Sequence, residues 1–85
     1  MDAPMQANEQ KLKRTLSEVF GVPEESINEE TSKDSVEAWD SLKHLNLVLA
    51  IEEQFDVSLS EEQSLEIMSF PLIKAVLGEH GVQFS

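Results

Sequence analysis

The sequence has no cysteine, only three glycines, few aromatic residues and few basic residues. Without cysteine there is no disulfide framework, no thiolate metal site and no cysteine nucleophile. The two histidines, His44 and His80, lie far apart in the sequence, which argues against a zinc site. No run of about 18 apolar residues occurs, and the first ten residues contain no apolar run. We therefore expect a soluble, cytoplasmic protein that does not insert into a membrane.

The chain has 85 residues, enough for one small domain but too few for two domains with an enzyme pocket between them. Apolar residues make up 40% of the sequence but aromatic residues only 6%, so the core must consist mainly of leucine, isoleucine and valine. Acidic residues number 17 against 6 basic ones, which gives a net charge of −11. Because phosphate backbones would be repelled, nucleic acid is excluded as a partner.

Apolar residues recur at helical spacing in several segments, which predicts an all-α fold. Long helices are expected over 9–20 and 41–55, and a third should restart at Ser69-Phe70-Pro71 and end at Gly78 or Gly81. A short helix should begin with a capping box over 60–63 and extend to about Met68. No alternation typical of strands appears. We expect a small four-helix bundle with three longer helices and one short one.

The remaining segments set the domain organisation. Residues 1–8 have no periodicity, so they are expected to form a loose N-terminal arm, and residues 9–85 are expected to form a single domain. Residues 22–40 form a long connection, held to the core by three apolar residues, Ile27, Val36 and Trp39. Trp39 could instead present its aromatic ring to a partner.

The negative charge is concentrated in one part of the chain. Between Glu24 and Glu66 there are 13 acidic residues against two lysines, a net charge of −11. This segment is either a solvated surface or a docking face for basic proteins. It has no glycine between Gly21 and Gly78, whereas a calcium-binding EF-hand loop requires one, so we expect no specific metal site.

Ser41 follows Asp40 at the predicted start of the most apolar helix. The amides and the positive dipole of a helix N-terminus favour a phosphate bonded to a serine there. An ordinary N-cap, formed by Asp40 or Ser41, is the alternative. A serine nucleophile would need a base and an oxyanion hole, and His44 follows without the strand-turn-helix motif of hydrolases. The sequence thus indicates a modified serine and not an enzyme.

Residues 39–55, with the sequence WDSLKHLNLVLAIEEQF, resemble the acyl carrier protein family. In that family Asp-Ser-Leu opens the second helix, and an apolar run leads to an ending of the type Glu-Glu-x-Phe. The resemblance extends over roughly residues 9–80, because the first helix, the acidic loop and the short acidic helix also fall where the family has them.

The resemblance implies that Ser41 is esterified by 4′-phosphopantetheine from coenzyme A, whose thiol carries acyl or aminoacyl groups as thioesters. The protein would be a non-catalytic monomer serving fatty-acid, polyketide or related specialised biosynthesis. Asp40 and Leu42 would be recognised by the phosphopantetheinyl transferase. The acyl-loading ligase or synthase and the acyltransferases would bring basic docking faces to an acidic partner surface formed by Glu52, Glu53, Glu61 and Glu62.

The cargo would also need shelter among aliphatic residues. The candidate lining residues are Leu45, Leu47, Val48, Leu49, Ile51, Leu59, Ile67 and Leu72. Plain core packing is the other interpretation of each of them. The sequence departs from primary fatty-acid carriers at Lys43, His44 and Asn46, where acidic residues are usual, and at Trp39, where small residues are usual. These departures suggest a specialised stand-alone carrier.

Two other functions are compatible with the composition. An unmodified helical interaction module that binds a basic protein would explain the charge and the core, but it leaves the placement of Ser41 as coincidence. A small acidic protein that buffers metal ions is weaker, because the calcium-loop pattern is missing.

Overall fold

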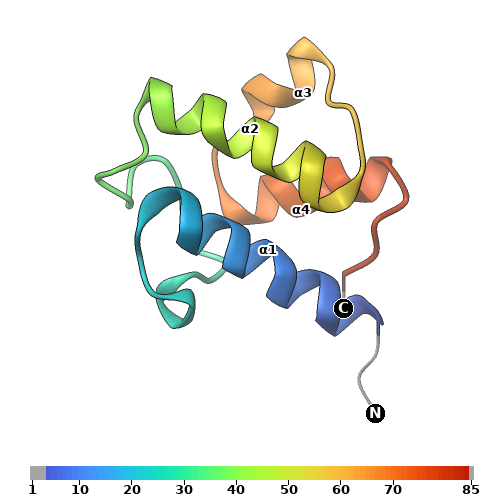
Figure 1. Ribbon diagram of the computed structural model, residues 1–85, viewed down its shortest axis with the longest axis horizontal. Helices are drawn as coiled ribbons and strands as arrows, with labels where there is room; N and C mark the ends of the chain where they lie inside the picture. Colours follow the sequence, from blue (N-terminus) through green and yellow to red (C-terminus); the bar gives the residue numbers. More distant parts are fainter. Residues whose placement is uncertain (1–3, 85) are drawn as a thin grey trace.

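The computed structural model describes residues 4–84, which form four α-helices and one 3₁₀ turn (Figure 1). In chain order the elements are α1 (Pro4–Phe20), η1 (Glu24–Ser26), α2 (Ser41–Phe55), α3 (Glu61–Glu66) and α4 (Phe70–Glu79). The predicted all-α bundle of three longer helices and one short helix is confirmed. The only pairing of strand type within residues 4–84 is an isolated antiparallel bridge between Ser32 and Ser69.

The first helix begins earlier than predicted. It starts at Pro4 and not at Glu9, because a proline is well tolerated in the first turn, where its missing N–H is not needed. The Asn8 side chain then donates a hydrogen bond to the carbonyl of Gln83, at 3.1 Å. The expected loose arm over residues 1–8 is therefore helical from Pro4 onward, and residues 1–3 lie outside the described part of the chain.

The second and third helices follow their predicted start signals. Helix α2 has the predicted bounds, Ser41–Phe55. Helix α3 begins with the predicted capping box, in which Ser60 and Gln63 satisfy each other's backbone amides. It ends at Glu66, before the predicted Met68, because the backbone of Ile67 leaves the helical region and the Met68 carbonyl accepts a hydrogen bond from the Lys33 amide at 2.9 Å.

Helix α4 restarts the chain at Phe70, with Pro71 in its first turn as predicted. Its N-cap is Ser69, whose hydroxyl accepts a hydrogen bond from the Leu72 amide at 3.2 Å. The helix ends at Glu79, between the two glycines predicted as possible ends. Gly81 has a φ of +88°, which explains why a glycine follows this helix.

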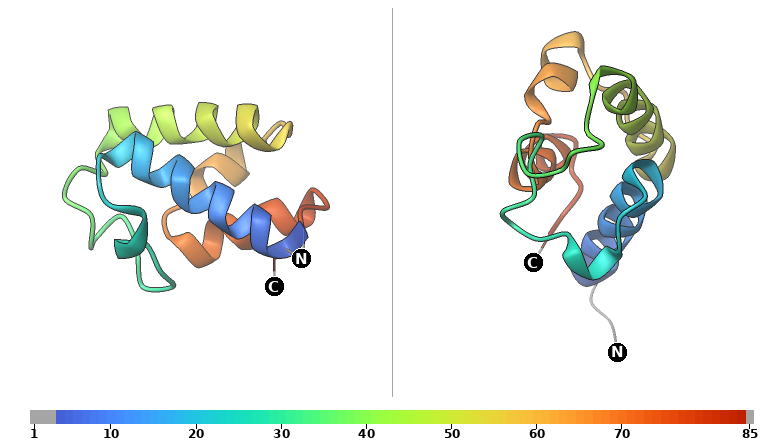
Figure 2. Two further views of the ribbon diagram at one scale, coloured as in Figure 1. Left: turned by 60° about the horizontal axis from the view of Figure 1, so that its bottom comes forward. Right: turned by 90° about the vertical axis from the view of Figure 1, so that its left-hand side faces the viewer.

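The core lies between α1 and α2 on one side of the molecule and α4 on the other, as Figure 2 shows. Helix α3 sits at one end, next to α4 (Figure 1). The long connection also contributes to the core, since Ile27 and Trp39 are buried and Val36 packs against them half-buried, as predicted. The buried apolar residues are Leu12, Leu16, Phe20, Ile27, Trp39, Leu47, Ile51, Ile67, Phe70, Ile73, Val76 and Leu77.

None of the helices in residues 4–84 is both long enough and apolar enough to cross a membrane.

Candidate functional site

Ser41 is the first residue of α2, and its side chain is exposed to solvent. It follows the long connection directly, at the point where that connection reaches the core through Trp39. The next residue, Leu42, is also largely exposed. Ser41 is therefore presented at the surface on a rigid helix, next to the amides and the positive dipole end of that helix.

Asp40, and not Ser41, is the N-cap of α2. Its backbone is extended, its carboxylate accepts a hydrogen bond from the Lys43 amide at 2.8 Å, and its carbonyl accepts one from the His44 amide at 2.8 Å. The alternative that Ser41 serves as an ordinary cap is therefore wrong. Because Asp40 fills that role, the Ser41 hydroxyl is not needed to begin the helix.

His44 is not arranged as a base for Ser41, because both of its ring nitrogens have other partners. The Trp39 Nε1 donates a hydrogen bond to His44 Nδ1 at 3.0 Å. His44 Nε2 lies 2.6 Å from the carbonyl oxygen of Ser64 in α3. Trp39 itself is only 3% exposed, so it holds the long connection to the core and is not available to a partner.

The four predicted acidic partner residues do not share one environment. Glu53, Glu61 and Glu62 are exposed. Glu52 is half-buried, and its Oε2 accepts a hydrogen bond from the Leu59 amide at 2.8 Å. The Glu52 carboxylate thus supports the turn between α2 and α3, which is a structural task that the sequence did not reveal.

The eight candidate cargo-lining residues also divide. Leu47, Ile51 and Ile67 are buried in the core, whereas Val48 and Leu59 are half-buried. Leu45, Leu49 and Leu72 are 61%, 65% and 47% exposed, so in this conformation they line no interior space. Together with Leu42, Leu45 and Leu49 form an exposed apolar row along α2.

Two further apolar residues that the sequence pattern did not indicate, Leu65 and Met68, are exposed. Leu65 lies in α3, among acidic residues that give the short helix no clear apolar face. The sequence could have indicated this exposure only because Leu65 is the single large apolar residue in a short acidic helix.

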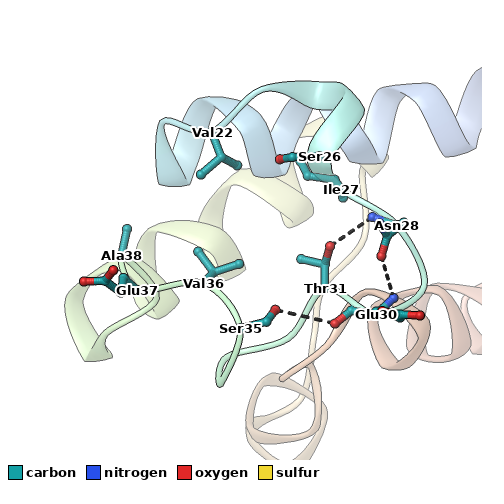
Figure 3. Close-up of a pocket in the computed structure, with 10 residues that line it drawn as sticks. All are labelled: Val22, Ser26, Ile27, Asn28, Glu30, Thr31, Ser35, Val36, Glu37 and Ala38. Carbon is teal, nitrogen blue, oxygen red and sulfur yellow. Dashed lines mark hydrogen bonds between the residues drawn. The ribbon is translucent and has the colours of Figure 1, made fainter.

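A cavity of about 500 Å³ lies under the long connection (Figure 3). Its polar lining atoms are largely used by the loop itself: the Asn28 amide donates to Thr31 Oγ1, and the Glu30 amide donates to Asn28 Oδ1. None of the predicted cargo-lining residues borders this cavity, which is lined by Val22, Ser26, Ile27, Asn28, Glu30, Thr31, Ser35, Val36, Glu37 and Ala38.

Metal binding has no geometric support in the described part of the chain. Across residues 4–84, no three or more acidic or histidine side chains are grouped so that they could hold a metal ion.

The residues around Ser41 fit an esterified phosphate. The serine is exposed, so a transferase can reach its hydroxyl. The carboxylate of the preceding residue, Asp40, is already hydrogen-bonded to the Lys43 amide. A phosphodiester on Ser41 would therefore lie at the amide end of α2, beside a carboxylate that is already engaged.

Comparison with protein families gives a match over most of the chain. The family model described as a phosphopantetheine attachment site matches residues 10–78. The matched segment includes most of α1, all of α2 and α3, and α4 as far as Gly78. Ser41 and the connection that leads to it lie inside the match.

Proposed function

The chain belongs to the family of phosphopantetheine attachment domains, and we propose that Ser41 is the residue that carries the group. Such a domain is the site of covalent 4′-phosphopantetheine attachment, so the chain is a carrier protein. When attached, the group supplies a thiol at the end of a flexible arm. This cysteine-free chain has no thiol of its own. Carrier domains of this family are generally non-catalytic and act together with modifying and biosynthetic enzymes.

The placement of Ser41 is the observation that carries this proposal. It is an exposed serine, it opens α2, and it is not the N-cap. The rigid start of a helix positions the modified residue, while the buried Trp39 fixes the connection that precedes it. The arm would therefore project from a defined point on an ordered surface.

We infer that the cargo is an acyl or aminoacyl group held as a thioester for a biosynthetic pathway. The transferase that modifies Ser41 would contact Asp40 and the exposed Leu42 on either side. Loading and acyl-transferring enzymes with basic docking faces would bind the exposed carboxylates of Glu53, Glu61 and Glu62. Glu52 would contribute less, because its carboxylate is already bound to the Leu59 amide.

Intact-mass measurement tests the attachment site. The purified protein is incubated with coenzyme A, magnesium and a broad-specificity phosphopantetheinyl transferase, in parallel with Ser41→Ala and Ser58→Ala. Ser58 is the matched control, since it is an exposed serine outside the helices. We expect a single added phosphopantetheine on the wild type and on Ser58→Ala, and none on Ser41→Ala.

Addition to Ser41→Ala would place the group elsewhere and contradict the proposal. A folded wild-type protein that stays unmodified with several transferases would favour the other function considered, an unmodified acidic module that binds a basic protein.

A further inference from the structure

Helix α3 is attached to the molecule differently from the other helices. None of the side chains of Glu61–Glu66 is buried, and the first buried residue, Ile67, comes directly after the helix ends. Isolated helices of this length are unstable in water, so the position of α3 must depend on polar contacts and on the apolar residues that flank it, the half-buried Leu59 before it and Ile67 after it.

Two hydrogen bonds of Gln63 join α3 to the end of α4. The Gln63 Nε2 donates a hydrogen bond to Glu79 Oε1 at 2.9 Å, and Gln63 Oε1 lies 2.9 Å from His80 Nε2. Glu79 and His80 are exposed and Gln63 is half-buried, and these contacts hold the face of α3 that lies next to α4.

The other contact joins α3 to α2, and the chemistry of Trp39 determines its direction. An indole N–H can only donate, so His44 Nδ1 must accept the hydrogen bond from Trp39 Nε1. The proton of the neutral imidazole then resides on Nε2, which donates to the Ser64 carbonyl. Trp39 and the Ser64 carbonyl therefore require the same tautomer of His44, and the indole N–H adds to its preference for the form that can bind α3.

Of the two partners of His44, Trp39 is buried in the core. The Trp39 ring packs against Phe20 at the end of α1, with centroids 4.7 Å apart. The other partner is the Ser64 carbonyl, which belongs to a short helix without buried side chains. His44 lies between them, one helical turn after Ser41.

We propose that Trp39 and His44 are positioning residues that clamp α3 against the first turns of α2. When the His44–Ser64 hydrogen bond breaks, α3 can move away from α2 while the Gln63 contacts and Ile67 keep it attached on the α4 side. The clamp does not depend on the carrier function proposed above, because its parts are residues of this chain alone.

The clamp can be tested on the unmodified protein by nitrogen-15 NMR and amide hydrogen exchange. Long-range spectra of the His44 ring should show the wild type as one tautomer, with the proton on Nε2. Trp39→Phe keeps an aromatic ring beside Phe20 but removes the indole N–H, so the preference of His44 for the Nε2–H tautomer should weaken, and the Nδ1–H form should become detectable. This signature would not change if Trp39 only filled space.

Exchange of the Ser64 amide, which is bonded to the Ser60 carbonyl, reports on α3. We expect it to accelerate at least about fivefold in both Trp39→Phe and His44→Leu, which corresponds to the roughly 1 kcal/mol of one hydrogen bond. The Ile73 amide, bonded to the Ser69 carbonyl, reports on α4 and should change much less. Asn46→Gln alters an exposed residue of α2 and is the matched control.

Four results would overturn the clamp: a wild-type His44 with its proton on Nδ1, an unchanged Ser64 exchange rate in His44→Leu, equal acceleration at Ser64 and Ile73, or a wild-type Ser64 amide without protection, since α3 would then not be held. Because no step requires phosphopantetheine, failure of the clamp and failure of the carrier proposal give separate results.

Discussion

The indole ring of Trp39 packs against the phenyl ring of Phe20, with centroids 4.7 Å apart and ring planes inclined by 30°. This contact joins the end of α1 to the end of the long connection, immediately before the cap and the first residue of α2. Both rings are buried, so the pair contributes apolar burial and aromatic contact together. The position of Ser41 thus depends on a core contact made two residues earlier.

Trp39→Ala should destabilise the protein strongly. Removing a buried aromatic side chain leaves a cavity and costs about 3–5 kcal/mol. We expect a much smaller loss for Trp39→Phe, which retains the ring contact. Denaturant unfolding followed by circular dichroism measures the free energy of unfolding of both variants. Equal losses would contradict the expectation that ring packing is the main contribution of Trp39 to stability.

Lys74 should make stability depend on alkaline pH. Burial by itself would lower the pKa of Lys74, but its hydrogen bonds and charge interactions with Glu29 and Glu9 outweigh that effect and raise the pKa. The folded state therefore holds this proton more tightly than the unfolded state. The resulting stability is fully present below the unfolded pKa of 10.5 and is lost as the pH rises through the higher folded value.

The measurement for Lys74 is the difference in unfolding free energy between the wild type and Lys74→Met, taken at neutral and at strongly alkaline pH. We expect about 1 kcal/mol at neutral pH, since Glu29 is well exposed, and a smaller difference at alkaline pH. Lys13→Met is the control, because among residues 4–84 the only acidic partner of Lys13 is Glu9, at 3.8 Å. A difference for Lys74 that is constant with pH would refute the assignment.

Glu52 and Glu53 are neighbours in the sequence, but only Glu52 has a structural hydrogen bond. Replacing each in turn therefore distinguishes a carboxylate that stabilises the fold from one that is free for docking. Glu52→Ala should cost about 1–2 kcal/mol of stability, because the half-buried Leu59 amide loses its charged acceptor. Glu53→Ala should change stability by less than about 0.5 kcal/mol, since Glu53 is exposed. Thermal or denaturant unfolding decides between them, and similar costs for the two variants would argue against the role given to Glu52.

Divalent cations should stabilise the protein without a specific site. The net charge is −11, and the carboxylates repel one another at low ionic strength. We expect millimolar magnesium or calcium to raise the melting temperature in a low-salt buffer, and sodium chloride to reduce the effect. An unchanged melting curve would show that the acidic surface is not crowded enough to matter.

Local signals were sufficient for most of the helices and for the placement of Ser41. The start of α2, the capping box of α3 and the restart of α4 at Phe70 each depend on a few adjacent residues that satisfy the first amides of a helix. Such contacts span three or four residues, so they are visible in the sequence. The start of α1 differs from the prediction because residues 4–8 have no apolar periodicity to indicate a helix, although Pro4 suits a first turn.

The sequence by itself determined the helical pattern, the acidic surface and an exposed serine at the start of a helix, because periodicity, charge and capping are local properties. Only the tertiary structure decided that Glu52 supports a turn, that Leu45 and Leu49 lie at the surface, and that His44 joins Trp39 to the Ser64 carbonyl. An amphipathic pattern shows which residues could be buried, but the packing partners select among them. A hydrogen bond between residues 20 positions apart exists only once the chain has folded.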